Sequence, residues 1–223
     1  MSLPTSEDLD ALFADERSTT PEKSETTPDT YNQVSVLYVR VEVVTSLETS
    51  KPEAIRRENP AAVIDDFKDL TEKTGLKVMP TKDENATMVP AFADDTEKDL
   101  SQAHRLAKLG LTLKNKSRQY QFDNGGSPGL RAGLEIGTIP ESVSVNPHLC
   151  YDLTRRTIKT ARALATKSDT GEIMVREQTV EAFGERTRGD FVFVKNQELT
   201  LSSSGSTQTY FLQESTNNPF CSI

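Results

Sequence analysis

The most regular alternation of apolar and polar side chains lies between Val34 and Leu47, in the sequence VSVLYVRVEVVTSL. Successive side chains of a strand point to opposite faces of a sheet, so each face can be read separately. One face is purely apolar and consists of Leu37, Val39, Val41 and Val43. The other face carries Arg40 and Glu42 near its middle. We predict a central strand with its apolar face under helices, and the role of the two charges becomes the main functional question.

Helical periodicity follows this strand. Asn59 and Pro60 begin a helix that ends at Gly75, because asparagine caps a helix, proline fits the first turn and glycine fits the end. Further helices are predicted over residues 95–116, 151–166 and 177–183.

Short β-prone runs lie between and after these helices. A hairpin with an acidic tip is predicted from residues 76–79 and 86–92, joined by a turn at 81–85. Other strands are predicted over residues 130–137, 142–145, 172–175, 191–195 and 208–212. The segment 124–129 is glycine-rich but lacks the Gly-Lys-Ser/Thr ending of a phosphate loop, so we interpret it as a turn. The pattern predicts an α+β fold with a mixed, mainly antiparallel sheet, helices on one face and a hairpin at the C-terminal end.

The ends of the chain have a different composition. Residues 1–32 are poor in apolar side chains and rich in Ser, Thr, Pro and acidic residues, which predicts a disordered tail. A folded domain is expected over residues 33–214, followed by a C-terminal tail over residues 215–223. Within the first tail, residues 6–13 form a short acidic amphipathic pattern. It is either a docking segment for a protein partner or a terminal helix with no partner.

Charge and composition exclude several classes of function. The chain has 223 residues, a net charge of −8 and a pI near 5.0, which argues against binding nucleic acid or an anionic membrane surface. No apolar run is long enough to span a bilayer, and no secretory signal begins the chain. Two cysteines and two histidines, without clustering, argue against a disulfide framework and a zinc site. We expect a cytoplasmic protein.

Five segments, taken in order, resemble the motifs of the class III adenylyl/guanylyl cyclase homology domain. They are Ser35–Leu47, Leu130–Gly137, Thr160–Leu164, Gly171–Val175 and a closing set made of Phe183, Arg188-Gly189, Val194-Lys195 and Thr209–Leu212. The resemblance covers roughly residues 34–214. It implies a ferredoxin-like nucleotide-cyclase fold.

The resemblance also implies which positions would carry the chemistry. Cyclases of this family use two aspartates to hold two magnesium or manganese ions, which bind the phosphates and activate the ribose hydroxyl. Arg40 stands at the first of these positions, and a cation cannot bind a metal ion. Asp83 matches the second position. The resemblance therefore implies that one metal ligand is kept and the other is replaced.

The positions for base, ribose and phosphate recognition are also changed. The base-reading lysine falls near Met79, with Lys77 two residues earlier. The second base-reading position is Arg155, and the ribose-orienting asparagine is Ile158. Only the arginine that stabilises the transition state is kept, as Arg162. A chain that lacks both halves of the site resembles a pseudo-cyclase, with no metal cofactor expected, or Mg²⁺ or Mn²⁺ if it is active.

Three functions stay open. The first is a non-catalytic signalling or interaction module that forms a homodimer or heterodimer through the face of Arg40 and Glu42. The second is an active or partner-dependent cyclase acting on ATP or GTP. The third is a metal-independent nucleotide sensor that holds phosphates on a basic helix patch, Arg155, Arg156, Lys159 and Arg162. That patch is otherwise a solvated basic face.

The residues themselves suggest one contact. Arg40 on the strand and Asp83 at the hairpin tip are placed to form a salt bridge in which the guanidinium takes the place of a metal charge. The alternative is that Arg40 only extends into solvent.

Overall fold

A computed structural model of the chain describes residues 31–45, 53–94, 101–138, 147–187, 189–201 and 205–215. Several predictions from the sequence lie outside these residues. They concern residues 1–30 of the tail predicted over residues 1–32, its segment 6–13, the strand at 142–145, part of the closing turn at 202–204 and the end of the C-terminal tail. The last two residues of the predicted tail, 31 and 32, instead begin a strand.

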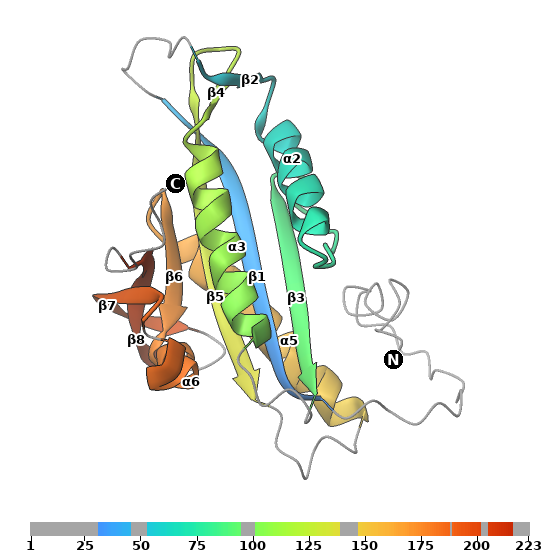
Figure 1. Ribbon diagram of the computed structural model, residues 1–223, viewed down its shortest axis with the longest axis vertical. Helices are drawn as coiled ribbons and strands as arrows, with labels where there is room; N and C mark the ends of the chain where they lie inside the picture. Colours follow the sequence, from blue (N-terminus) through green and yellow to red (C-terminus); the bar gives the residue numbers. More distant parts are fainter. Residues whose placement is uncertain are drawn as a thin grey trace.

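A six-stranded mixed sheet forms the centre of the molecule, with the strand order β3-β1-β5-β6-β8-β7 (Figure 1). Its strands are β1 (Tyr31–Val44), β3 (Ala86–Asp94), β5 (Ser127–Thr138), β6 (Glu172–Arg176), β7 (Phe191–Leu201) and β8 (Gly205–Glu214). The strand β1 pairs antiparallel with both β3 and β5, and only β5 and β6 pair parallel. The predicted central strand and the mainly antiparallel sheet are therefore confirmed.

Four helices are described: α2 (Pro60–Lys73), α3 (Ser101–Ser117), α5 (Pro147–Lys167) and α6 (Glu177–Thr187). The predicted start of α2 is confirmed, because the Asn59 side chain accepts a hydrogen bond of 3.0 Å from the Ala62 backbone N–H. Its predicted end is also confirmed, since Gly75 has a φ of +75° just after the last turn. Among the described residues, no helix is long and apolar enough to cross a membrane.

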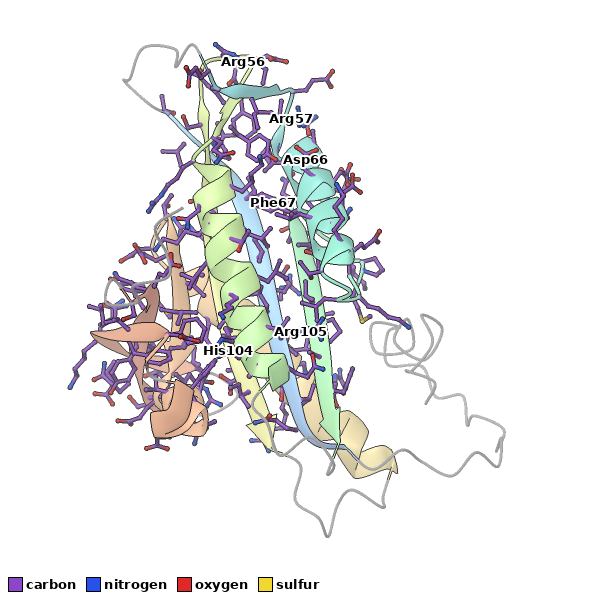
Figure 2. The ribbon with its side chains drawn as sticks, viewed as in Figure 1. Arg56, Arg57, Asp66, Phe67, His104 and Arg105 are labelled. Atoms are coloured by element: carbon purple, nitrogen blue, oxygen red, sulfur yellow. The ribbon has the colours of Figure 1, made fainter. Side chains whose placement is uncertain are left out.

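The helices cover both faces of the sheet, which corrects the prediction that they pack on one face. The helices α2, α3 and α6 pack on the face of Leu37, Val39 and Val41, in the main hydrophobic core, to which α2 contributes Phe67 (Figure 2). The helix α5 lies on the opposite face, where Ile158, Ala161 and Ala165 pack against Val34, Val36 and Tyr38. The α+β class stands. Apolar periodicity does not reveal which side of a sheet a helix covers, so the error could not be avoided from the sequence.

Two glycines of β5 allow α5 to lie directly on the sheet. A Cβ atom added at Gly133 would meet the Ala161 carbonyl oxygen at 2.2 Å, and one added at Gly137 would meet Thr157 Oγ1 at 2.2 Å. Both distances are far below van der Waals contact, so only glycine fits at these positions. The two glycines of the GLEIG sequence therefore allow α5 to pack closely against β5.

The structure differs from the prediction in two shorter segments. Residues 76–79 are not a strand, and only Met79 forms an isolated bridge to Met88 of β3. A small parallel sheet of β2 (Ile55–Arg57) and β4 (Tyr120–Phe122) was not predicted. Strands of three residues are too short to show a periodicity, so sequence patterns give no signal for them.

Candidate functional site

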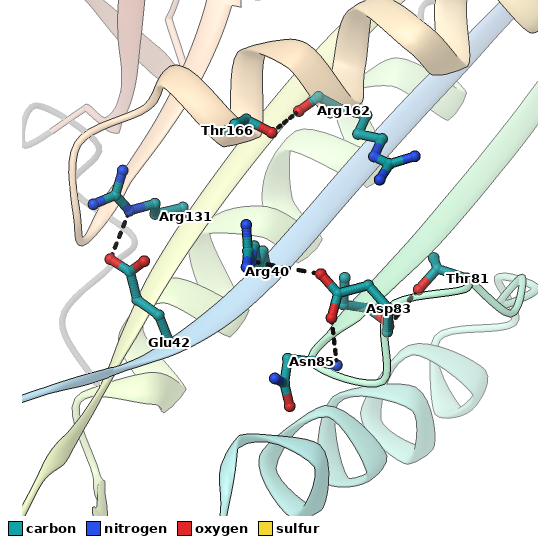
Figure 3. Close-up of polar contacts among 9 residues, drawn as sticks. Arg40, Glu42, Thr81, Asp83, Asn85, Arg131, Arg162 and Thr166 are labelled. Carbon is teal, nitrogen blue, oxygen red and sulfur yellow. Dashed lines mark hydrogen bonds and ion pairs between the residues drawn. The ribbon is translucent and has the colours of Figure 1, made fainter.

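The face of β1 that carries Tyr38, Arg40 and Glu42 is the candidate site, and we call it the Tyr38 face. The helix α5 covers its part around Val34, Val36 and Tyr38. The part around Arg40 and Glu42 stays open to solvent, with Arg40 exposed and Glu42 half-buried. Figure 3 shows this open part, with Arg162 of α5 and the loop 81–85 on either side of β1.

The predicted salt bridge between Arg40 and Asp83 is confirmed. Arg40 Nε lies 3.5 Å from Asp83 Oδ2, with side-chain exposures of 44% and 29%. The two residues come from different elements, because Asp83 lies on the loop that precedes β3 (Figure 3). An ion pair that is this exposed is screened by water, and its contribution to stability is small.

The loop that carries Asp83 is held in place by short-range hydrogen bonds. The Asn85 backbone N–H donates to Asp83 Oδ1 at 3.0 Å, and Thr81 Oγ1 lies 2.6 Å from the Asp83 carbonyl oxygen. The Asn85 carbonyl oxygen accepts from the Val41 backbone N–H at 2.9 Å, which fixes the loop to β1 beside Arg40. The backbone thus presents the Asp83 carboxylate to Arg40 before any ligand is added.

Glu42 is also paired, with Arg131 of β5. Arg131 Nε lies 2.6 Å from Glu42 Oε1, and the Thr170 hydroxyl donates to the same oxygen at 2.9 Å. Arg131 stands directly opposite Arg40 in the β1–β5 register, where two like charges repel. Each arginine turns to a different carboxylate, so the two cations are neutralised separately.

The four basic residues predicted as a patch lie on α5. Arg155, Lys159 and Arg162 follow each other at spacings of four and three residues, which places them on one side of the helix. Arg156 lies farther round the helix and is exposed. Arg162 is exposed, and its guanidinium extends toward β1 (Figure 3).

Burial and nearby charges shift the pKa of the Tyr38 phenol. Burial raises the pKa of the Tyr38 phenol, and the Asp83 carboxylate also raises it, whereas the Arg162 and Arg40 guanidinium groups and a hydrogen bond with Thr81 lower it. Charges act at this strength only over short distances. Arg40, Asp83 and Arg162 are therefore the charged groups whose field reaches the Tyr38 phenol.

Two further positions implied by the resemblance are part of the core. Met79 is buried and its backbone N–H donates to the Met88 carbonyl oxygen at 2.8 Å. Ile158 is buried with Tyr38 in the same apolar cluster. Lys77 is exposed. At Met79 and Ile158 the chain thus has packing side chains where base and ribose recognition would need polar groups.

The donor set does not fit a divalent metal ion. Mg²⁺ and Mn²⁺ favour several oxygen ligands, usually carboxylates. Asp83 supplies one carboxylate, which faces a guanidinium and accepts the Asn85 N–H. Within the described part of the chain, no three His, Cys, Asp or Glu side chains are grouped so that they could hold a metal ion.

A further arginine–carboxylate pair, in addition to Arg40–Asp83 and Arg131–Glu42, was missed from the sequence. Glu135 of β5 and Arg176 of β6 form an ion pair with side-chain exposures of only 2% and 10%. Arg176 Nε donates to both Glu135 oxygens at 3.1 and 3.0 Å, and the Thr179 hydroxyl of α6 adds a contact of 3.2 Å. Burial raises the pKa of Glu135, although Arg176 and Thr179 act against this shift. A charge inside a predicted strand was the available signal, as it was for Arg40.

Sequence comparison identifies the family. The family described as the adenylate and guanylate cyclase catalytic domain matches residues 26–214, which is most of the chain. The chain therefore belongs to this family, and the resemblance seen in the sequence is confirmed. No curated protein matches the chain.

Solved structures show the same fold at low sequence identity. The guanylate cyclase domain of RhGC from Catenaria anguillulae, in complex with GTP, is 16% identical with a TM-score of 0.56, covering 82% of this chain and 97% of that one. The adenylyl cyclase CyaB from P. aeruginosa is 12% identical with a TM-score of 0.54, covering 83% and 96%. A non-canonical dimeric guanylyl cyclase domain of the RhoGC fusion protein from Blastocladiella emersonii is 16% identical with a TM-score of 0.53, covering 82% and 97%.

Proposed function

We propose that this chain is a non-catalytic cyclase-homology domain that acts inside the cell as a signalling or protein-interaction module. The observation that carries the proposal is the Arg40–Asp83 ion pair of 3.5 Å. It puts a fixed positive charge beside the one carboxylate that matches a metal ligand of the family. The guanidinium then satisfies Asp83 without a metal ion, and it repels any divalent cation that approaches.

The replaced recognition positions support the same proposal. Met79 and Ile158 are buried apolar side chains, so neither provides a hydrogen bond to a purine or a ribose. Arg162 alone keeps a catalytic role by resemblance. An arginine can stabilise developing charge, but it neither activates a hydroxyl nor holds a triphosphate in line.

Product analysis tests the absence of catalysis. The purified chain is incubated with ATP or GTP and Mn²⁺ or Mg²⁺, and cyclic nucleotide is separated and measured against a buffer control. We expect none above the control. Any cyclic nucleotide formed in a protein-dependent way overturns the proposal and supports an active cyclase. Adding a second cyclase domain to the same assay tests the partner-dependent alternative.

A metal-binding measurement tests the role of Arg40 without relying on activity. Free Mn²⁺ is followed by electron paramagnetic resonance in the presence of the wild-type chain, Arg40→Asp and Arg40→Ala. The wild type is expected to leave the free Mn²⁺ signal unchanged, whereas Arg40→Asp, which places a second carboxylate beside Asp83, is expected to reduce it. Arg40→Ala is the matched control for loss of the cation alone. Equal binding by the wild type and Arg40→Asp contradicts the proposed role.

The metal-independent nucleotide sensor is a second candidate, favoured by the charges around Tyr38. The Arg162 guanidinium extends toward β1, which carries Arg40 (Figure 3), and the sensor would hold one anion between these two cations. Thermal shift with ATP, GTP and inorganic phosphate in EDTA measures this, since a ligand that binds only the folded state raises the melting temperature. A shift that disappears in Arg162→Gln supports the sensor, and no shift in the wild type removes it.

We also propose that the module dimerises through the open part of the Tyr38 face, as a homodimer or a heterodimer. The support is its position, since Arg40 and its surroundings are exposed and the family builds its sites between two domains. Light scattering coupled to gel filtration, on the wild type and on Arg40→Glu, tests the homodimer. If the chain is a monomer at every concentration, the homodimer is rejected. The heterodimer is then tested by adding candidate cyclase domains.

A further inference from the structure

Three cations on α5 have no ion-pair partner among the residues that the structure describes. We call Arg155, Lys159 and Arg162 the α5 stripe, and Lys159 and Arg162 are exposed. Four arginines outside α5 are paired with a carboxylate: Arg40, Arg57, Arg131 and Arg176. A row of three unpaired cations on an acidic protein indicates a surface that binds an anionic partner.

One partly buried apolar side chain packs on the same cluster as α5. Ile158, which precedes Lys159, is itself buried in that cluster under Tyr38. Phe92 of β3, an edge strand, is only partly buried against that cluster. A ligand for this surface therefore combines negative charges with apolar side chains, which describes an acidic amphipathic peptide better than a free phosphate.

The chain itself contains such a peptide. Residues 6–16 read SEDLDALFADE and combine five acidic side chains with Leu9, Leu12 and Phe13. Residues 1–30 as a whole contain eight acidic and two basic side chains, although the net charge of the entire chain is only −8. Most of the excess negative charge thus lies in the part of the chain that precedes β1.

The attachment point of this peptide lies close to the α5 stripe. Thr157, two residues after Arg155, faces Gly137 of β5, and Gly137 pairs with Val34 of β1. Val34 is three residues after Tyr31, where β1 begins. The N-terminal ends of β1 and α5 accordingly lie at the same end of the sheet in Figure 1.

The connection is also long enough. The residues between Phe13 and Tyr31 can span up to about 60 Å when extended, whereas the seven-residue step from Arg155 to Arg162 covers only about 10 Å of helix. A connection of this length keeps a peptide at an effective concentration on the order of millimolar near its site. A weak electrostatic contact is then sufficient for occupancy.

We propose that the α5 stripe is a docking surface for an acidic amphipathic peptide, and that residues 6–16 of the same chain occupy it. The bound segment covers Lys159 and Arg162 and neutralises their charge. The docking itself does not depend on whether the domain makes a cyclic nucleotide, and its test uses no nucleotide.

Zero-length carbodiimide cross-linking of the full chain tests the proposal, because Lys159 is the one amine of the α5 stripe. Coupled peptides are identified by mass spectrometry. We expect Lys159 to join a carboxylate of residues 6–16 with at least about fivefold higher yield than the exposed control lysines Lys73 of α2 and Lys195 of β7. Since the contact is electrostatic, the excess is expected to disappear in 0.5 M salt, where the screening length falls to about 4 Å.

Charge variants of the full chain supply the controls. The triple change Glu7→Gln, Asp8→Asn and Asp10→Asn is expected to remove the Lys159 cross-link. The triple change Glu22→Gln, Glu25→Gln and Asp29→Asn alters the charge equally outside residues 6–16 and is expected to leave the yield within about twofold of the wild type. The paired change Arg155→Gln and Arg162→Gln tests the rest of the α5 stripe, and circular dichroism checks that each variant is folded.

A mixture of ¹⁴N- and ¹⁵N-labelled chains distinguishes the occupants. Cross-links confined to chains of one label support docking within the chain. Mixed-label cross-links mean that the segment docks on a second copy, and they overturn the intrachain proposal. Yields at Lys159 no higher than at Lys73 and Lys195, or equal loss in both triple variants, overturn the docking surface as a whole.

Discussion

Among the arginine–carboxylate pairs around the Tyr38 face, Arg40–Asp83 and Arg176–Glu135 differ most in their exposure to water. Arg40 and Asp83 meet at the open part of the Tyr38 face, whereas Arg176 and Glu135 are almost completely buried between β5, β6 and α6 (Figure 3 shows the first pair). Water screens the first pair, so it adds little to stability and is free to change with function. The second pair has no solvent to replace a lost partner, so each residue depends on the other.

The same contrast holds at other ion pairs. Lys114 of α3 is buried and reaches Glu172 at 2.7 Å, whereas Lys108 on the same helix is exposed and lies 3.8 Å from Asp190. The domain therefore has buried pairs that join separate elements of its core and exposed pairs on its surface. Four experiments test this division.

The largest effect is expected for Arg176→Ala. It leaves the Glu135 carboxylate buried without its cation, which costs about 3–5 kcal/mol of unfolding free energy. Urea denaturation at pH 7 measures the loss. Arg162→Ala, which removes an exposed arginine, is the control and is expected to stay within about 0.5 kcal/mol. Similar losses for the two variants refute the contrast between buried and exposed arginines.

A smaller loss is expected for Lys114→Met. The substitution keeps the buried alkyl chain but removes a charged hydrogen bond, worth about 1.5–3 kcal/mol. Lys108→Met on the same helix is the matched control, with an expected change of about 0–1 kcal/mol. Denaturant unfolding compares both variants with the wild type. If Lys108→Met costs as much as Lys114→Met, burial does not decide the strength of these pairs.

The pH dependence of the unfolding free energy, through His104, tests the contrast between buried and exposed charges. Its Nε2 lies 3.1 Å from Asp190 Oδ2, yet burial and the nearby Lys108 charge lower the pKa of His104, with Asp190 acting in the opposite direction. The unfolded chain then binds the proton more tightly, so stability present above pH 6.5 is lost as the pH falls below it.

Unfolding free energies at pH 8 and pH 5.5 measure this effect, which is expected to be smaller than either substitution. The wild type is expected to lose more stability on acidification than His104→Gln, in which the titrating group is absent. Parallel losses in the two proteins show that other groups cause the pH dependence.

The smallest effect on stability is expected for Arg40→Ala. An exposed pair contributes about 0–1 kcal/mol, and Asp83 keeps its hydrogen bond from the Asn85 N–H. Thermal melting of the variant should therefore match the wild type within a few degrees. A loss above about 2 kcal/mol would mean that Arg40 is needed for the stability of the fold. The Mn²⁺-binding comparison would then have to use other substitutions at Arg40 that keep the protein stable.

Much of the fold could be predicted from the sequence. The alternation around Leu37 and Val39 predicted β1, and Asn59, Pro60 and Gly75 predicted the limits of α2, because these are local preferences of the backbone. The order of family motifs predicted the fold of residues 34–214, and the family match confirms it. The Arg40–Asp83 contact followed from a charged strand position and a hairpin tip that the family brings together.

Tertiary structure decided the rest. A periodic helix can cover either face of a sheet, so only the packing of Ile158 on Tyr38 showed that α5 lies opposite α2 and α3. The Glu135–Arg176 pair joins residues 41 positions apart, and its partners meet only because β5 and β6 pair in one particular register. The sequence by itself determined the strands, the caps and the charged positions, since these depend on neighbouring residues. Which charges are buried, and which meet water, depended on contacts between distant segments.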